Sequence, residues 1–188
     1  MKNVTTRERA VRPDFLPVAL AAVALSVGAG CSATSTPARS PAEEAAKMTA
    51  QDRCDAPDVA EAALAPLFEG DAIQSSEPIY TAVSHSGSGA GGNYSQLIGA
   101  VVRVSAIRGF TAEWLDRALE CHSARRVLGQ IPESAIPNDP FWLPGRTVDI
   151  EVAVGRDGFH VNVRGKNVAD AEEILARANR YVEVHAHR

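Results

Sequence analysis

The stretch QLIGAVVRVSAIRGFTAEWLDRALECHSARRVLG, residues 96–129, decides the fold because it predicts a strand, a tight turn and a helix. Apolar residues alternate along 98–106, which is typical of a strand with one buried face. Gly109 allows a sharp reversal, and Thr111 is a candidate N-cap because its hydroxyl can accept a backbone N–H of the first turn. Apolar side chains then recur with helical spacing up to Gly129, a residue type that often follows a helix C-terminus.

Residues 148–181 predict a second unit, an antiparallel hairpin followed by a helix. Apolar residues alternate along 148–154 and 159–163, on either side of a turn at 155–158. Asn167 is a candidate N-cap for the next helix, and residues 182–184 suggest a short final strand. Upstream, residues 55–68 predict a weak helix that Pro66 interrupts, and residues 73–83 predict a strand that Pro78 restricts to an edge or a bend.

These elements together predict an α+β fold, a two-layer sandwich with a mostly antiparallel sheet of about four strands and helices packed on one face. Nine apolar side chains are expected in its core: Val102, Val104, Leu115, Ala118, Ile150, Val152, Val161, Leu175 and Ala178.

The first 30 residues have the organisation of an export signal. A basic start precedes a short apolar run at residues 15–27, which is too short for a comfortable membrane span. The run leads into Ala29, Gly30 and Cys31, and here the chain resembles bacterial lipoprotein signals, although an aliphatic residue is usual at Gly28. The resemblance implies that Cys31 is lipidated and becomes the mature N-terminus. In such lipoproteins an Asp after the lipidated Cys retains the protein in the inner membrane. This chain has Ser32 at that position, so the resemblance implies that the protein is located in the outer membrane. The alternatives are ordinary cleavage nearby, which leaves a free secreted protein, and an uncleaved anchor.

The chain beyond the signal divides into three parts by composition. Residues 31–53 are rich in Ser, Thr, Pro and Ala, and predict a flexible tether. Residues 54–184 are long enough for a single domain with its own core, and residues 185–188 form a tail. If Cys31 carries lipid, Cys54 and Cys121 remain as a disulfide pair in an oxidising compartment, with two separate thiols as the alternative.

The charge of the chain argues against one class of partner. Residues 1–30 contribute four basic and two acidic side chains to the net charge of −4, so the rest of the chain carries −6. An acidic domain with few aromatic residues does not suggest binding to nucleic acid or to an anionic membrane surface.

Residues 111–184 resemble BON domains of bacterial envelope proteins. The resemblance depends on the order of helix, strand, strand and helix, on the hairpin turn at Asp157-Gly158 and on Gly165 before the helix. The proline-rich loop at 130–146 and the strong strand before Thr111 depart from that pattern. As a whole the chain is similar to exported bacterial lipoproteins of uncharacterised function, a likeness that implies no activity.

Candidate ligand-binding residues are few. His185 and His187 form an H-x-H pair that would point two imidazoles to one side of a strand, which makes them weak metal candidates. Adjacent Cys121 and His122 project about 100° apart on a helix and cannot share a metal without further ligands. Phe141 and Trp142 would either line a ligand site or pin the long loop to the domain.

The sequence contains no constellation typical of an enzyme. Gly87, Gly89 and Gly92 have the spacing G-x-G-x-x-G, but the next predicted element is a strand, so a hairpin loop is favoured over a nucleotide site and no cofactor is expected. We therefore expect a non-catalytic envelope-tethered lipoprotein, a binding or structural module. Its expected partners are the membrane, through the lipid, and an unknown envelope protein or small ligand. The alternative is a periplasmic metal-binding protein with His and Cys ligands.

Overall fold

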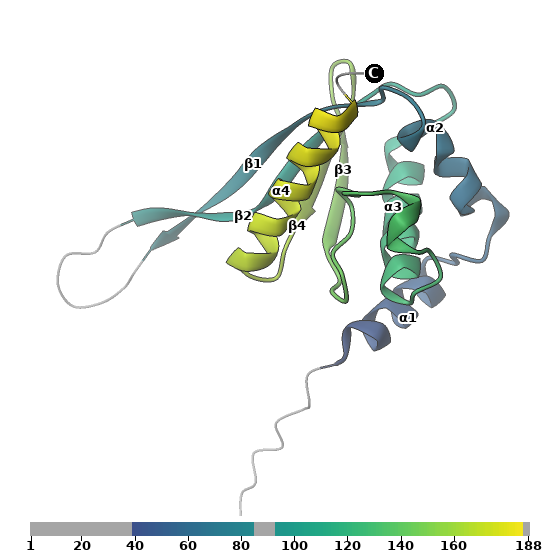
Figure 1. Ribbon diagram of the computed structural model, residues 1–188, viewed down its shortest axis with the longest axis horizontal. Coiled ribbons are helices and arrows are strands. Elements are labelled where there is room, and N and C mark those ends of the chain that lie inside the picture. The colour runs from purple at the N-terminus through teal and green to yellow at the C-terminus, as the bar shows by residue number, and fades with distance from the viewer. Residues whose placement is uncertain (1–38, 85–92, 186–188) are drawn as a thin grey trace, which may run out of the picture. The chain divides into compact units, whose positions relative to one another are not determined.

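A computed structural model describes residues 39–84 and 93–185 (Figure 1). Its elements are, in order, α1 (Pro41–Gln51), the 3-10 turns η1 (Pro57–Val59) and η2 (Glu61–Leu64), α2 (Ala65–Phe68), β1 (Ile73–Ser84), β2 (Asn93–Ser105), α3 (Ala112–Val127), η3 (Glu133–Ala135), β3 (Asp149–Val154), β4 (Gly158–Arg164) and α4 (Val168–His185).

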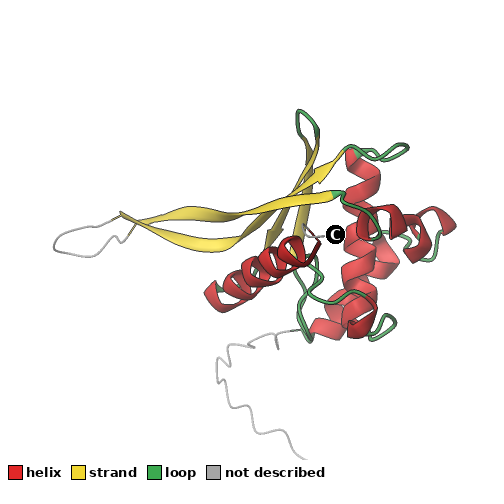
Figure 2. Cartoon of the chain, turned by 45° about the horizontal axis from the view of Figure 1, so that its top comes forward, coloured by secondary structure: helices red, strands yellow, loops and turns green. Residues whose placement is uncertain are grey.

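The four strands form one antiparallel sheet in the order β1-β2-β4-β3. Because β2 and β3 are both antiparallel to β4, they run parallel to each other, and α3 connects them. β1 lies at one edge, as expected from Pro78, which has no N–H to donate to a neighbouring strand. In Figure 2 the paired ends of β1 and β2 extend beyond α4.

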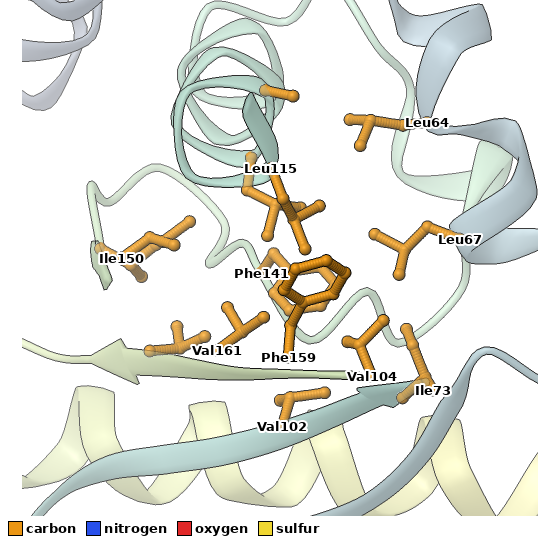
Figure 3. Packing of buried hydrophobic residues seen from close by; sticks show 14 of the residues in the cluster. Leu64, Leu67, Ile73, Val102, Val104, Leu115, Phe141, Ile150, Phe159 and Val161 are labelled. Atoms are coloured by element: carbon orange, nitrogen blue, oxygen red, sulfur yellow. The ribbon is translucent and has the colours of Figure 1, made fainter. Parts of the chain in front are cut away.

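One face of the sheet is apolar, and the helices cover it. Val102 and Val104 pair with Val161 and Phe159, all four are buried, and Figure 3 shows their side chains rising from the strands toward α3. α4 lies on the same face, because Asn179 accepts a 2.6 Å hydrogen bond from Ser76, the β1 partner of Val102. The opposite face carries polar residues such as Arg103 and Glu151. The predicted α+β fold is thereby confirmed.

The predicted core is also confirmed. Seven of its nine side chains are buried, and the other two, Val152 and Leu175, are partly buried against the same cluster.

The turns and caps that the sequence predicts are present. The hydroxyl of Thr111 accepts the N–H of Trp114 at 3.2 Å, and Gly109 has a positive φ of 91°. Gly129, with φ 71°, ends α3 in a Schellman motif, in which its N–H and that of Gln130 donate to carbonyls of the last turn. Asn167 accepts the N–H of Asp170 at the start of α4. Each of these bonds satisfies a backbone group that a helix end leaves unpaired.

The expected tether at 31–53 is wrong in its second half, because residues 41–51 form α1. Ser40 and Glu43 make a capping box there, with bonds of 3.2 and 2.9 Å between each side chain and the other's backbone N–H. Ala45 is completely buried where α1 packs against α3. The folded domain therefore begins before Cys54, near Ser40.

Two further expectations are corrected. The single helix predicted at 55–68 is two 3-10 turns and the short α2, with Pro57 and Pro66 each in the first turn of a new helical segment. The strand suggested at 182–184 belongs to α4, which continues to His185.

Cys54 and Cys121 form a disulfide with a Cα–Cα distance of 5.3 Å, which confirms the predicted pair. The bridge joins the segment after α1 to the middle of α3, and both cysteines are buried. The predicted signal at 1–30 and the lipidation site Cys31 lie outside the described residues. Within residues 39–84 and 93–185, no helix combines the length and the apolar character that a membrane crossing needs.

Candidate functional site

A buried cluster of charged side chains surrounds His122, in the middle of α3. The imidazole is completely buried, and each of its nitrogens faces a carboxylate. Nδ1 lies 2.5 Å from Oε1 of Glu61, and Nε2 lies 2.6 Å from Oδ2 of Asp139. Ionised carboxylates only accept hydrogen bonds, so this geometry requires a proton on both ring nitrogens.

The electrostatics agree with a charged imidazolium. Burial alone would lower the pKa of His122, but the charge and hydrogen bond of Asp139, together with Glu61, outweigh it and raise the pKa to about 9. Asp139 is also completely buried, which opposes its ionisation, yet His122 and Arg126 hold its pKa below the usual value. At neutral pH the two groups therefore form a buried ion pair.

The same cluster fixes the proline-rich loop at 130–146. Arg126 donates to the backbone carbonyls of Pro132 and Ile136, at 2.7 and 3.1 Å, and its Nε lies 3.2 Å from Oδ2 of Asp139. Arg177 of α4 donates to the carbonyl of Asp139 at 3.1 Å. Side chains from both α3 and α4 thus hold the loop in one conformation.

Phe141 and Trp142 lie inside the domain. Phe141 is completely buried in the core, and its N–H donates to Oδ1 of Asp139 at 2.9 Å. The guanidinium groups of Arg126 and Arg177 lie 4.4 and 5.1 Å from the centre of the Trp142 ring, within cation–π range. The two aromatic residues anchor the loop in this arrangement, and a contact between them and a ligand stays a prediction.

A pocket of about 540 Å³ opens between η2 and α2, the first part of this loop, and the end of α4. We call it the loop pocket. Its apolar wall consists of Ala65, Phe68, Ile131, Ala135, Ile136, Pro137 and Tyr181, and its polar lining residues include Glu61, Glu69 and His185. The volume lies in the range of small-molecule sites, which are mostly apolar with a few polar groups.

The aromatic side of the loop pocket is held by specific contacts. The hydroxyl of Tyr181 donates to the carbonyl of Phe68 at 3.1 Å, and the two rings meet edge to face, with centroids 6.4 Å apart. The His185 ring stacks on Tyr181 with centroids 4.0 Å apart, and its Nδ1 lies 2.8 Å from the Tyr181 carbonyl oxygen. Phe68 also lies 5.3 Å from the ring of His122. The charged cluster therefore lies directly behind the aromatic wall.

The metal candidates are only partly described. His185 points its ring at Tyr181, whereas His187 lies outside the described residues. Among the residues that the structure describes, no three His, Cys, Asp or Glu side chains are grouped so as to hold a metal ion.

Sequence reasoning missed Glu61, His122 and Asp139 as a cluster, and its ligand-loop candidates, Phe141 and Trp142, are not among the residues that line this pocket. Ile131, Ile136 and Pro137 line it, from the first half of residues 130–146.

Comparison with models of known protein families found no match. Comparison with curated proteins and comparison with solved structures found no match either. The resemblance of residues 111–184 to BON domains therefore stays a prediction.

Proposed function

We propose that this protein is an exported, non-catalytic binding module that is tethered to the cell envelope and takes a small ligand in the loop pocket. The observation that carries the proposal is the fixed wall of this pocket. Arg126 and Arg177 hold the backbone of the loop, and the buried pair of His122 and Asp139 holds Arg126. A site that is already ordered before binding loses less conformational entropy when a ligand enters.

The disulfide supports the export part of the proposal. Stable disulfides form in oxidising compartments such as the periplasm, whereas cytosolic thiols are kept reduced. Cys54 and Cys121 are buried and at bonding distance, so the bridge belongs to the folded state.

If Cys31 carries lipid, α1 limits how far the domain can move from the membrane. Eight residues, 32–39, separate Cys31 from the N-cap Ser40. At about 3.5 Å per extended residue, they reach at most roughly 30 Å. The tether then keeps the domain close to the membrane, and the ligand would be bound there.

Mass spectrometry of the mature N-terminus tests the tether. The expected result is a chain that begins at Cys31 and carries lipid. An unmodified N-terminus at another residue would remove the tether and leave the loop pocket as the binding site of a soluble exported protein.

A pocket-filling variant tests the binding site. Ala135 lines the loop pocket and is exposed, so Ala135→Trp fills the pocket without entering the core. Ala153→Trp is the matched control, because Ala153 is exposed on the uncovered face of the sheet. Native mass spectrometry after incubation with small molecules extracted from the cell envelope should show a bound ligand on the wild type and on the control. Equal binding to Ala135→Trp would contradict the proposal.

Melting the protein with and without Zn²⁺ or Cu²⁺ separates this proposal from the metal-binding alternative. A ligand that binds only the native state must raise its stability, so a metal site would raise the melting temperature. A rise with Zn²⁺ that His185→Ala abolishes would favour the alternative.

A further inference from the structure

The carboxylates that line the loop pocket have no lysine or arginine beside them in the lining. Glu61 and Glu69 are carboxylates, Tyr181 and His185 are the other titratable residues of the lining, and neither lysine nor arginine lines the pocket among the described residues. An anionic ligand would therefore meet no fixed cation in this lining, whereas a cationic ligand would meet two carboxylates.

The two carboxylates do not contribute equally. Glu61 is bound to His122, and its second oxygen lies 3.7 Å from Nη1 of Arg125, so neighbouring cations already balance its charge. Glu69 is exposed and makes no ion pair with another described residue. Glu69 is consequently the carboxylate whose charge a ligand would meet.

The aromatic wall favours the same ligand. Phe68 is the residue next to Glu69, and Tyr181 packs against Phe68 with its ring held by a hydrogen bond. The face of an aromatic ring attracts a cation within about 6 Å of its centroid. The apolar side chains of Ile131 and Ile136 line the same space and can bury a hydrocarbon body.

We infer that the ligand of the loop pocket is an organic cation, an amine or ammonium compound with an aromatic or aliphatic body. Its cationic group lies between Glu69 and the ring of Phe68, and its body lies against the isoleucines. This inference rests on the proposed function, since it identifies the chemical class of the ligand that the pocket takes.

Three probes of similar size and different charge test the inference: 2-phenylethylamine, 2-phenylethanol and 3-phenylpropionate. Calorimetric titration of the full mature chain at pH 7 is expected to rank the amine first, the alcohol second and the carboxylate last. Glu69→Gln should weaken the amine by about two- to fivefold, which is the size of one exposed ion pair, and leave the alcohol unchanged. Glu172→Gln is the matched control, because it removes the same charge from an exposed position on α4.

The outcomes separate the inference from the proposed function. If the alcohol or the carboxylate binds as tightly as the amine, and Ala135→Trp abolishes that binding, the pocket takes a ligand but the inference is wrong. An amine affinity that Glu69→Gln leaves unchanged also overturns the inference. If none of the three probes binds at concentrations up to about 10 mM, both the inference and the proposed function are contradicted.

Discussion

Reduction of the Cys54–Cys121 disulfide is expected to lower the free energy of unfolding by about 4 kcal/mol. The two cysteines are 67 positions apart, so the bridge closes a long loop that includes β1, β2 and the first half of α3. In the chain-entropy model, closing a loop of this length removes on the order of 15 cal/mol/K of entropy from the unfolded chain, or about 4.4 kcal/mol at 25 °C.

The native contacts around the bridge do not depend on it. Arg125 donates to the carbonyl oxygens of Cys54 and Val59, and Trp114 Nε1 donates to the Asp58 carbonyl at 2.8 Å. The segment after α1 therefore stays bound to α3 when the sulfurs separate. The loss of stability arises mainly from the greater freedom of the unfolded chain.

Urea unfolding with and without a reductant measures the effect. With an m-value of about 2 kcal/mol/M, the reductant should move the midpoint down by about 2 M. The double variant Cys54→Ala/Cys121→Ala is the control, and its midpoint should not respond to reductant. A shift of the wild-type midpoint below about 0.5 M, or about 1 kcal/mol, would refute the argument from loop closure.

Three further predictions concern titratable side chains that are buried or partly buried. Asp139→Asn should lower the free energy of unfolding at pH 7 by about 3–5 kcal/mol in urea titrations, because His122 loses its buried counter-charge. The control Asp157→Asn, at an exposed position, should change the free energy of unfolding by less than about 0.5 kcal/mol. The pKa of His122 in the folded protein is about 9, above its ordinary value of 6.5. The charged imidazole therefore stabilises the fold fully below pH 6.5, and this contribution to the free energy of unfolding is lost as the pH rises through 9. In His122→Gln the free energy of unfolding should fall less between these two pH values. Partial burial, together with neighbouring carboxylates, raises the pKa of Glu120 from 4.5 to about 7. Ionisation of Glu120 therefore lowers the free energy of unfolding as the pH rises. The Glu120→Gln variant should be more stable than the wild type at pH 8 and equal to it at pH 4.

The sheet could be predicted from the sequence because its signal is local. Residues 148–163 alternate with a period of two on both sides of a short turn, and the strand at 98–106 does the same. The structure pairs the apolar positions of these strands directly, for example Val102 with Val161 and Val152 with Val161. The caps at Thr111 and Asn167 were predictable for the same reason, since each depends on residues one turn away.

α1 was missed although the sequence holds a signal for it. Ser40 and Glu43 have the spacing of a capping box, but the Ala- and Pro-rich composition around them predicted a flexible tether. What stabilises α1 is its packing on α3, with Ala45 buried, and a composition argument takes no account of tertiary packing.

The charged cluster had no signal in the sequence. Glu61 and Asp139 lie 61 and 17 positions from His122, and no spacing rule brings such residues together. Only the fold brings the 3-10 turns after Cys54 and the proline-rich loop together at His122. The loop pocket depends on the same tertiary arrangement, so sequence reasoning reached the loop but not the residues that line the pocket.

A titration of the ¹⁵N-labelled mature protein with 2-phenylethylamine, followed by amide chemical shifts, tests whether the loop pocket binds a ligand. We expect saturable shifts at the residues of the loop pocket, above all Phe68, Glu69, Ile131 and Ile136, and none in the Ala135→Trp variant. Shifts that saturate elsewhere, for instance around α1 and Arg164, or no shifts at all, would contradict the claim that the loop pocket is the binding site.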